Sequence, residues 1–77
     1  MNKILFFAHL RDLVGEEFVQ IDASGKTIAE LKKLIAEKFG IEIPKSVMTA
    51  INEEFARNEE VIKDGDTIAF IPPVSGG

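Results

Sequence analysis

Residues 27–40 read TIAELKKLIAEKFG and carry the clearest helix signal in the chain. Thr27 and Glu30 form a capping box, in which the threonine oxygen accepts from the third helical N–H and the glutamate reaches back to the threonine N–H. Gly40 is the glycine that commonly follows a helix, so the pattern predicts a helix from Thr27 to Phe39. Apolar side chains recur on one face of this helix at Ile28, Leu31, Leu34, Ile35 and Phe39. A helix with one apolar face must pack that face against another element.

The segments on either side of this helix have the composition of β-strands. Residues 3–8, KILFFA, are a short apolar run typical of a strand buried on both faces or nearly so. A connecting segment, residues 9–14, then turns at Gly15 and leads into a returning hairpin strand. The turn Asp64-Gly65-Asp66 precedes the last strand. The predicted strands are residues 3–8, 17–22, 47–52 and 67–71, with a short strand or an irregular loop within 55–62.

The order of elements is therefore strand, strand, helix, strand, short strand, strand. One helix with one apolar face is satisfied when it lies across one face of a mixed sheet of four or five strands. The first and last strands would be parallel neighbours at the sheet centre, joined by the long crossover that contains the helix. We therefore predict an α+β fold of the ubiquitin-like β-grasp type.

Composition limits the size and the chemistry of the protein. The chain has 77 residues, 45% of them hydrophobic, which is enough for one small domain. Thirteen acidic residues against 9 basic ones give a formal net charge of -4, which argues against nucleic acid as a partner. No apolar run approaches the roughly 18 residues that span a bilayer, so we expect a cytoplasmic protein without a membrane partner. With no cysteine and one histidine, an autonomous enzyme is improbable, and no metal site is predicted.

Three patterns have a catalytic or ligand-binding interpretation that we do not adopt. Residues 24–27 contain the Gly-Lys-Thr end of a phosphate-binding loop, but that loop needs a glycine five residues before Gly25, where this chain has Gln20. We interpret them as a turn before the capped helix. His9 has no visible partner and is interpreted as a surface or structural histidine. The remaining pattern is the set of acidic pairs, interpreted as solvated surface: Glu16-Glu17, Glu53-Glu54 and Glu59-Glu60.

The sheet face away from the helix is predicted to be apolar. If the even-numbered residues from Ile4 to Ala8 point toward the helix, the odd-numbered Leu5 and Phe7 point away from it. By the same alternation Ile71 points away beside Phe7, and Phe55 extends the patch. A contiguous apolar patch indicates a surface for a partner. The alternative is a second small core, made by loops folded over that face.

The chain ends in Pro72-Pro73-Val74-Ser75-Gly76-Gly77. Proline has no N–H to donate, so Pro72 ends the final strand. We expect a folded body over residues 1–71 and an extended, flexible tail over residues 72–77. Six extended residues span about 20 Å, and two glycines let the terminal carboxylate pass through a narrow channel. The pattern predicts that this carboxylate is itself the reacting group; the alternative is a frayed tail without a role.

Several segments together match one known family. They are residues 3–8 and 11–15, the helix at 27–39, residues 50–52, the turn at 64–66 and the ending AFIPPVSGG at 69–77. In these segments the chain resembles MoaD, the small subunit of molybdopterin synthase, within the MoaD/ThiS family of sulfur carriers. The ending is the most diagnostic part, because the thiamin sulfur carrier ThiS and ubiquitin-like modifiers share the Gly-Gly but usually not the Pro-Pro-Val stem.

The resemblance implies that the chain carries sulfur for molybdenum cofactor synthesis. An E1-like activating enzyme would use ATP to adenylate the carboxylate of Gly77, and a sulfur donor protein would convert the adenylate to a thiocarboxylate, a 1-thioglycine. The tail would then enter the large subunit of molybdopterin synthase, where the sulfur passes to cyclic pyranopterin monophosphate. Two transfers would build the dithiolene of molybdopterin. The chain itself would bind no cofactor and would be the non-catalytic subunit of the complex.

The resemblance also implies which residues meet the partners. The partner surface would consist of Phe7, Phe55 and Ile71. The part of the tail inserted ahead of the reacting Gly77 would consist of Pro72, Pro73, Val74, Ser75 and Gly76. The assembly would be a heterotetramer in which two small subunits flank a dimer of large subunits.

Three other functions stay open at this point. One is a sulfur carrier for thiamin thiazole synthesis. Another is a ubiquitin-like protein modifier whose Gly77 forms isopeptide bonds with lysines. The last is a non-covalent docking module, for which Gly76 and Gly77 would be dispensable.

Overall fold

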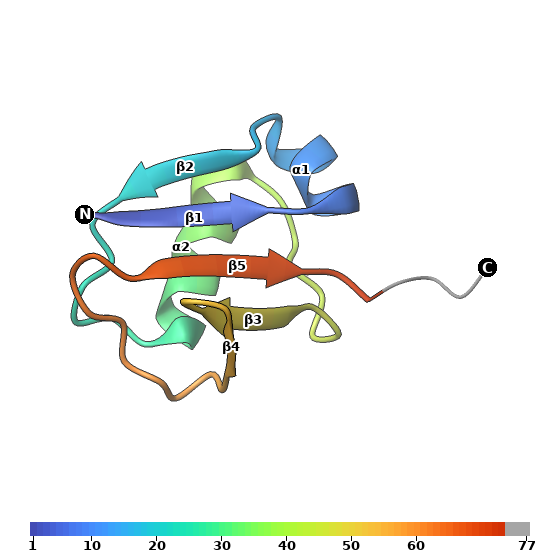
Figure 1. Cartoon of the computed structure of the whole chain (residues 1–77). Coiled ribbons are helices and arrows are strands. Elements are labelled where there is room, and N and C mark those ends of the chain that lie inside the picture. Colours follow the sequence, from blue (N-terminus) through green and yellow to red (C-terminus); the bar gives the residue numbers. More distant parts are fainter. Residues whose placement is uncertain (74–77) are drawn as a thin grey trace.

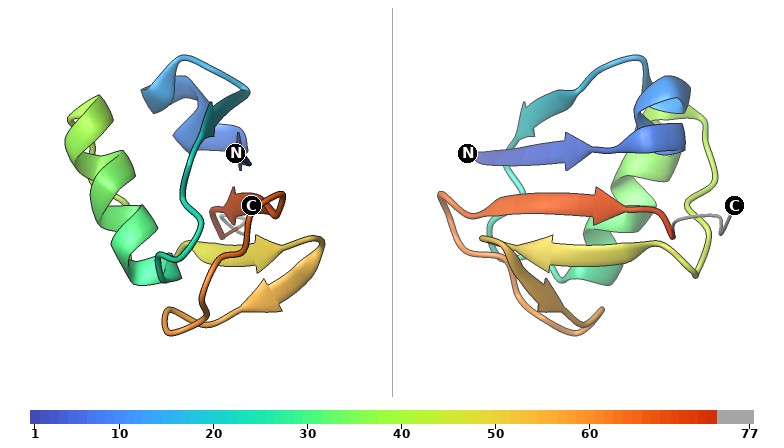
Figure 2. Two further views of the ribbon diagram at one scale, coloured as in Figure 1. Left: turned by 90° about the vertical axis from the view of Figure 1, so that its left-hand side faces the viewer. Right: turned by 45° about the vertical axis from the view of Figure 1, so that its right-hand side comes forward.

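Five β-strands form one mixed sheet, and a long helix lies across one of its faces (Figure 1, Figure 2). The computed structural model describes residues 1–73. The elements in chain order are β1 (Asn2–Phe6), α1 (Ala8–Val14), β2 (Phe18–Ile21), α2 (Ile28–Phe39), β3 (Met48–Ile51), β4 (Glu54–Ala56) and β5 (Thr67–Ile71). The strand order across the sheet is β2-β1-β5-β3-β4. None of the helices in this part of the chain is long and apolar enough to cross a membrane.

The first and last strands are parallel neighbours inside the sheet. Ile4 pairs with Ile68 and Phe6 with Phe70. The other pairs, β1 with β2, β3 with β5 and β3 with β4, are antiparallel. The predicted mixed sheet, with its parallel pair joined by a crossover that contains the main helix, is confirmed.

Helix α2 begins and ends where the sequence predicts. The N–H of Thr27 donates to Glu30 Oε1 at 2.8 Å, and the N–H of Glu30 donates to Thr27 Oγ1 at 3.2 Å, so both halves of the capping box form. Gly40 ends the helix with a φ of 63°, in the left-handed region that glycine adopts without strain. The predicted apolar face packs on the sheet, with Ile28, Leu31 and Ile35 fully buried and Leu34 and Phe39 partly buried.

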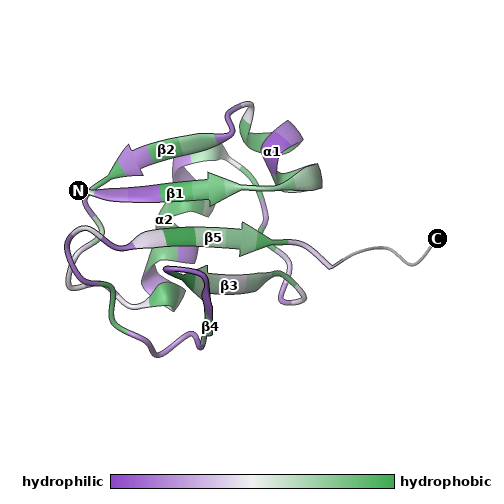
Figure 3. Ribbon diagram, viewed as in Figure 1, coloured by the Kyte–Doolittle hydropathy of each residue, from purple (hydrophilic) through white to green (hydrophobic). Residues whose placement is uncertain are grey.

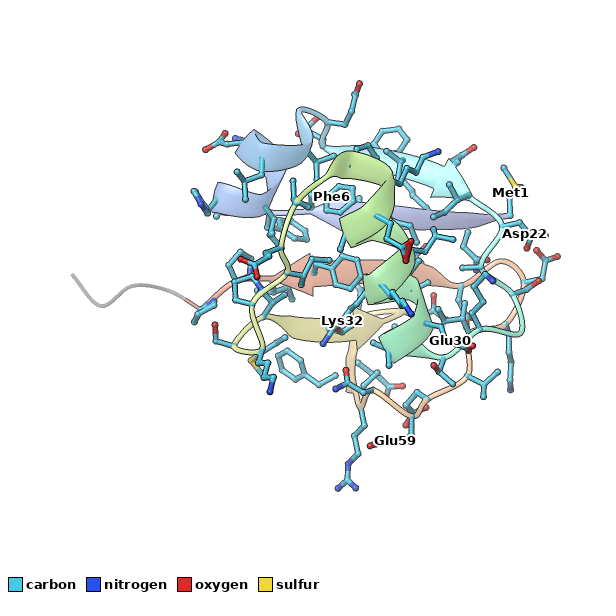
Figure 4. The ribbon with its side chains drawn as sticks, turned by 180° about the vertical axis from the view of Figure 1, so that it is seen from behind. Met1, Phe6, Asp22, Glu30, Lys32 and Glu59 are labelled. Carbon is cyan, nitrogen blue, oxygen red and sulfur yellow. The ribbon has the colours of Figure 1, made fainter. Side chains whose placement is uncertain are left out.

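The core lies between α2 and the sheet, as the view from the helix side in Figure 4 shows. Alternate residues of β1 and β5 point into it, namely Ile4, Phe6, Ile68 and Phe70. The ring of Phe6 meets that of Phe39 edge-on, with centroids 6.1 Å apart, and lies 6.0 Å from that of Phe70. The other buried apolar residues of this cluster are Leu10, Ala23, Ile28, Leu31, Ile35, Val47 and Ile62.

Two expectations for the chain after β1 are wrong. Residues 9–14 belong to a second, short helix, α1, rather than to a connecting segment. Ala8 is exposed at the start of α1 instead of pointing into the core, because β1 ends at Phe6. Leu10 is the only buried residue of α1. Leu10, Leu13 and Val14 do have the spacing of an apolar helix face, and Val14 packs against the core. This spacing covers little more than one turn, which is shorter than the stretch over which apolar periodicity distinguishes a helix from a turn.

The buried side chain of Asn2 joins three parts of the chain at the start of β1. It is 1% exposed. Its Nδ2 donates to the carbonyl oxygens of Lys63 at 2.8 Å and Asp66 at 3.0 Å, and its Oδ1 accepts from the N–H of Ala23 at 2.9 Å. Both amide hydrogens and the oxygen therefore have partners. The side chain fixes the turn before β5 against the start of β1.

We expect Asn2→Ala to lower the free energy of unfolding by about 2–4 kcal/mol, because it leaves buried backbone groups without hydrogen-bond partners. Urea denaturation followed by circular dichroism measures the loss. The control is Gln20→Ala, an exposed position on β2, where we expect a change within about 0.5 kcal/mol. Equal effects of the two substitutions would contradict the structural role of Asn2.

The capping box predicts a pH-dependent contribution to stability. The backbone N–H and then the hydroxyl of Thr27 hold the pKa of Glu30 below its ordinary value. A carboxylate with a lowered pKa stabilises the folded state above its ordinary pKa, and this contribution disappears as the pH falls through the folded-state pKa. Wild type should therefore be more stable than Glu30→Gln at about pH 7, and the two should converge by about pH 2.

Thr27→Ala removes the acceptor of the cap and should cost about 1 kcal/mol. Urea titrations of the three proteins at both pH values provide the measurement. A stability difference between wild type and Glu30→Gln that does not change with pH would disprove the electrostatic part of this account.

Candidate docking surface and C-terminal stem

The face of the sheet opposite α2 carries an apolar hollow of about 610 Å³, which we call the docking hollow. The small side chains of Ala50 and Ala69, paired across β3 and β5, leave room for it. Figure 3 shows that apolar residues make up much of β1, β5 and β3. The residues that line the hollow are Leu5, Phe7, Ala50, Asn52, Glu53, Phe55, Thr67, Ala69 and Ile71.

The three residues predicted to meet a partner all line the docking hollow. Phe55 is 70% exposed and Phe7 is 45% exposed, while Ile71 is half-buried. Within residues 1–73 no loop closes over Phe55, so these residues do not build a second small core on this face. Large apolar side chains gathered and exposed around one hollow are typical of an interaction surface.

Strand alternation explains why these side chains meet. Phe7 follows β1 and keeps an extended backbone, with φ −121° and ψ 153°, so its side chain continues the outward series of Leu5. Ala50 pairs with Phe55 across the β3–β4 hairpin. Ile71 is an outward residue of β5, next to the buried Phe70.

Met48 was not predicted to meet a partner, yet it lies beside the docking hollow and lines a neighbouring hollow together with Phe55. Met48 pairs with Ile71 and is 49% exposed. Strand alternation in β3 accounts for this position of Met48. Thr49 pairs with the buried Phe70 and points toward the core, so its neighbours Met48 and Ala50 point to the opposite face.

The C-terminal stem, Pro72-Pro73, leaves the sheet next to the docking hollow. It follows Ile71 at the end of the sheet where β1 gives way to α1 (Figure 1). Pro72 is half-buried and Pro73 is exposed, and both line a second hollow that they share with Leu10 and Leu13 of α1. The remaining predicted tail residues lie outside the described residues: Val74, Ser75, Gly76 and the reacting Gly77.

Residues 24–27 form a turn and not a phosphate-binding loop. The N–H of Gly25 donates to Ile62 O at 2.8 Å, and the N–H of Lys26 donates to Ala23 O at 3.1 Å. The N–H of Thr27 donates to Glu30 Oε1 in the capping box. Backbone groups that a phosphate would need are therefore already paired within the fold.

Titratable groups with shifted pKa values lie away from the docking hollow. The hydroxyl of Ser24, followed by its backbone N–H, holds the pKa of Asp22 below its ordinary value. This is a local turn contact, like the capping contact at Glu30. His9 is exposed, and in the part of the chain that the structure describes no three His, Cys, Asp or Glu residues gather as metal ligands.

Comparison with known proteins decides the family. The ThiS family matches residues 4–77, almost the entire chain. This chain belongs to the ThiS family. Two curated relatives of this ThiS-family protein are named "Molybdopterin synthase sulfur carrier subunit". The one from Haemophilus influenzae is 35% identical and the one from Escherichia coli is 32% identical, each over 100% of both chains.

Solved structures similar to this ThiS-family chain share its fold. A putative molybdopterin converting factor, subunit 1, from Pyrococcus furiosus has a TM-score of 0.79 at 30% identity and covers 95% of this chain and 97% of its own. Small archaeal modifier protein 1 from Methanosarcina acetivorans has a TM-score of 0.79 at 27% identity, covering 99% and 95%. A chain in the complex of subunits 1 and 2 of the molybdopterin-converting factor from Helicobacter pylori has a TM-score of 0.70 at 29% identity. The match covers 99% of this chain and 97% of that one. The predicted ubiquitin-like β-grasp fold is confirmed.

Phe55 of this ThiS-family protein is expected to be dispensable for folding. Phe55→Ala should change the free energy of unfolding by no more than about 0.5 kcal/mol, because the ring is largely exposed. Phe70→Ala, on the buried face of the same sheet, should cost about 3–5 kcal/mol. Urea denaturation of both variants measures this, and a large loss for Phe55→Ala would mean that the ring is part of the fold.

Proposed function

We propose that this protein is the sulfur carrier of molybdopterin synthase in molybdenum cofactor biosynthesis. The observation that carries the proposal is the full-length match to relatives named for this role in Haemophilus influenzae and Escherichia coli. The Pro-Pro-Val-Ser-Gly-Gly ending agrees with it.

The chemistry takes place at the C-terminal carboxylate of Gly77. An E1-like enzyme joins this carboxylate to the adenylyl group of ATP and releases pyrophosphate, which turns a poor leaving oxygen into a good one. A sulfur donor protein then displaces AMP, and Gly77 becomes a 1-thioglycine. The thiocarboxylate sulfur is transferred to cyclic pyranopterin monophosphate in the large subunit. ATP is bound by the activating enzyme and the pterin by the large subunit, so this chain needs no cofactor of its own.

The position of the docking hollow supports a mechanism in which this chain carries the carboxylate and its partners hold the ATP and pterin sites. The stem leaves the sheet beside Ile71, so a protein that covers Phe7, Phe55 and Ile71 can receive residues 72–77 in its active site at the same time. Tethering the carboxylate in this way replaces random collision by positioning. A complex of subunits 1 and 2 is known for the Helicobacter pylori molybdopterin-converting factor. We propose the same pairing here, as a heterotetramer with two copies of each subunit.

The net charge of -4 suggests how the partners recognise the body of the protein. Opposite charges on two surfaces speed their encounter and disfavour wrong partners. We therefore propose basic surfaces on the activating enzyme and on the large subunit, no role for nucleic acid, and action in the cytoplasm.

A second candidate function is covalent protein modification. It is favoured by the similarity to small archaeal modifier protein 1 of Methanosarcina acetivorans. In that case the activated Gly77 would form an isopeptide bond with a lysine amine instead of accepting sulfur. The family match also leaves room for a carrier in thiamin thiazole synthesis.

The decisive experiment is reconstitution from purified components. The protein is incubated with the activating enzyme, ATP and a sulfur donor, and intact-mass spectrometry should detect the replacement of one terminal oxygen by sulfur. Adding the large subunit and cyclic pyranopterin monophosphate should then yield molybdopterin. The matched control lacks Gly76 and Gly77, should keep the melting temperature of the wild type, and should give neither product.

The outcomes separate the candidates. A thiocarboxylate that forms but yields no molybdopterin would overturn the proposed pathway and direct attention to thiazole synthesis. Higher-mass conjugates in extracts of the native host, absent for the truncated control, would establish the modifier function. Activity of the truncated protein would contradict every mechanism that uses Gly77.

A further inference from the structure

Of the described residues that line the docking hollow, Glu53 alone carries a charge. Asn52 and Thr67 are its polar neighbours in the lining, and the remaining members are apolar. Glu53 is exposed in the isolated chain. A carboxylate at the rim of an apolar surface is solvated while the surface is open, but it loses water when a partner covers the hollow.

The backbone holds Glu53 in a conformation that its residue type disfavours. Asn52 and Glu53 form the two-residue turn between β3 and β4, with φ angles of 50° and 72°. A hairpin turn with both φ angles positive normally has asparagine followed by glycine. Asparagine at the first position fits this rule, whereas glutamate at the second is strained.

The turn does not depend on the glutamate side chain. Asn52 is fixed by its own contacts, since its N–H donates to Thr67 O at 2.8 Å, its Oδ1 accepts from the N–H of Thr67 at 2.9 Å, and its Nδ2 donates to Asp66 Oδ1 at 2.9 Å. Within residues 1–73 no hydrogen bond or ion pair joins the Glu53 carboxylate to another group. The strained glutamate therefore makes no contact that explains its presence in the folded chain.

We propose that Glu53 forms an ion pair with an arginine or lysine of the molybdopterin synthase large subunit when that subunit covers the docking hollow. The inference rests on the proposed function, which supplies the partner. A carboxylate covered by an apolar interface without a cation would oppose binding, so the partner must bring a basic side chain to this rim. The acidic net charge of the chain favours the same choice of partner surface. Glu53 thus fixes how the large subunit is oriented on the hollow and excludes partners that lack the cation.

The neighbouring Glu54 offers a matched control. It belongs to β4, is exposed, and carries the same charge, but it lines a different hollow, with Lys63 and Asp66, and not the docking hollow. Glu53→Gln and Glu54→Gln remove the same charge from adjacent residues. Glu53→Gly removes the side chain and relieves the positive φ at once.

The test is isothermal titration of the full chain and its variants with the purified large subunit, at about 50 mM and about 500 mM salt. At low salt we expect Glu53→Gln to weaken binding about tenfold, and the difference from wild type to shrink at high salt. Glu54→Gln should stay within about twofold of wild type at both salt concentrations. Glu53→Gly should bind as weakly as Glu53→Gln while melting at a higher temperature than wild type.

Several results would overturn the proposal. One is equal affinity of Glu53→Gln and Glu54→Gln for the large subunit. Another is a loss of affinity in Glu53→Gln that does not depend on salt. The last is a Glu53→Gly variant that binds as tightly as wild type. In those cases molybdopterin formation by the wild type would leave the proposed function intact. A wild-type chain that does not bind the large subunit at all would overturn both.

Discussion

The parallel pairing of β1 with β5 is the interaction on which the rest of the structure depends. It places Ile4 beside Ile68 and Phe6 beside Phe70, which together form the surface that α2 covers. The same pairing sets the other face, where Leu5 lies beside Ala69 and forms part of the docking hollow. Because the strands are parallel, β5 ends where β1 ends, and the C-terminal stem therefore leaves the sheet beside Phe7. One register thus defines the core, the hollow and the root of the tail.

Much of this arrangement follows from the sequence by local rules. The capping box and the apolar face of residues 27–39 predict α2 because they depend only on contacts within one helix and on its period. Strand alternation brings Phe7 and Ile71 to the open face, and the structure places both around the docking hollow. Phe55 joins them because β4 pairs with β3, a contact that the residues 55–62 suggest only weakly.

What the sequence does not reveal depends on tertiary contacts or on backbone angles. Helix α1 shows helical spacing only at Leu10, Leu13 and Val14, little more than one turn, and Ala8 is exposed because β1 ends at Phe6. Glu53 looks like part of an ordinary acidic pair, and only the hairpin register shows that it has a positive φ and faces the hollow. Asn2 looks like an unremarkable polar residue near the N-terminus, although it is buried and fully hydrogen-bonded.

The depth of the docking hollow is set by two alanines, Ala50 and Ala69, which face away from the main core. A larger side chain at either position would occupy the space that a partner fills, while the packing against α2 stays as it is. The size of the side chains at these two positions therefore determines the shape of the surface that a partner meets. Leucine could replace one alanine in the carrier while the partner loses a matching volume. These two altered proteins would bind each other and not the wild-type proteins in the same cell.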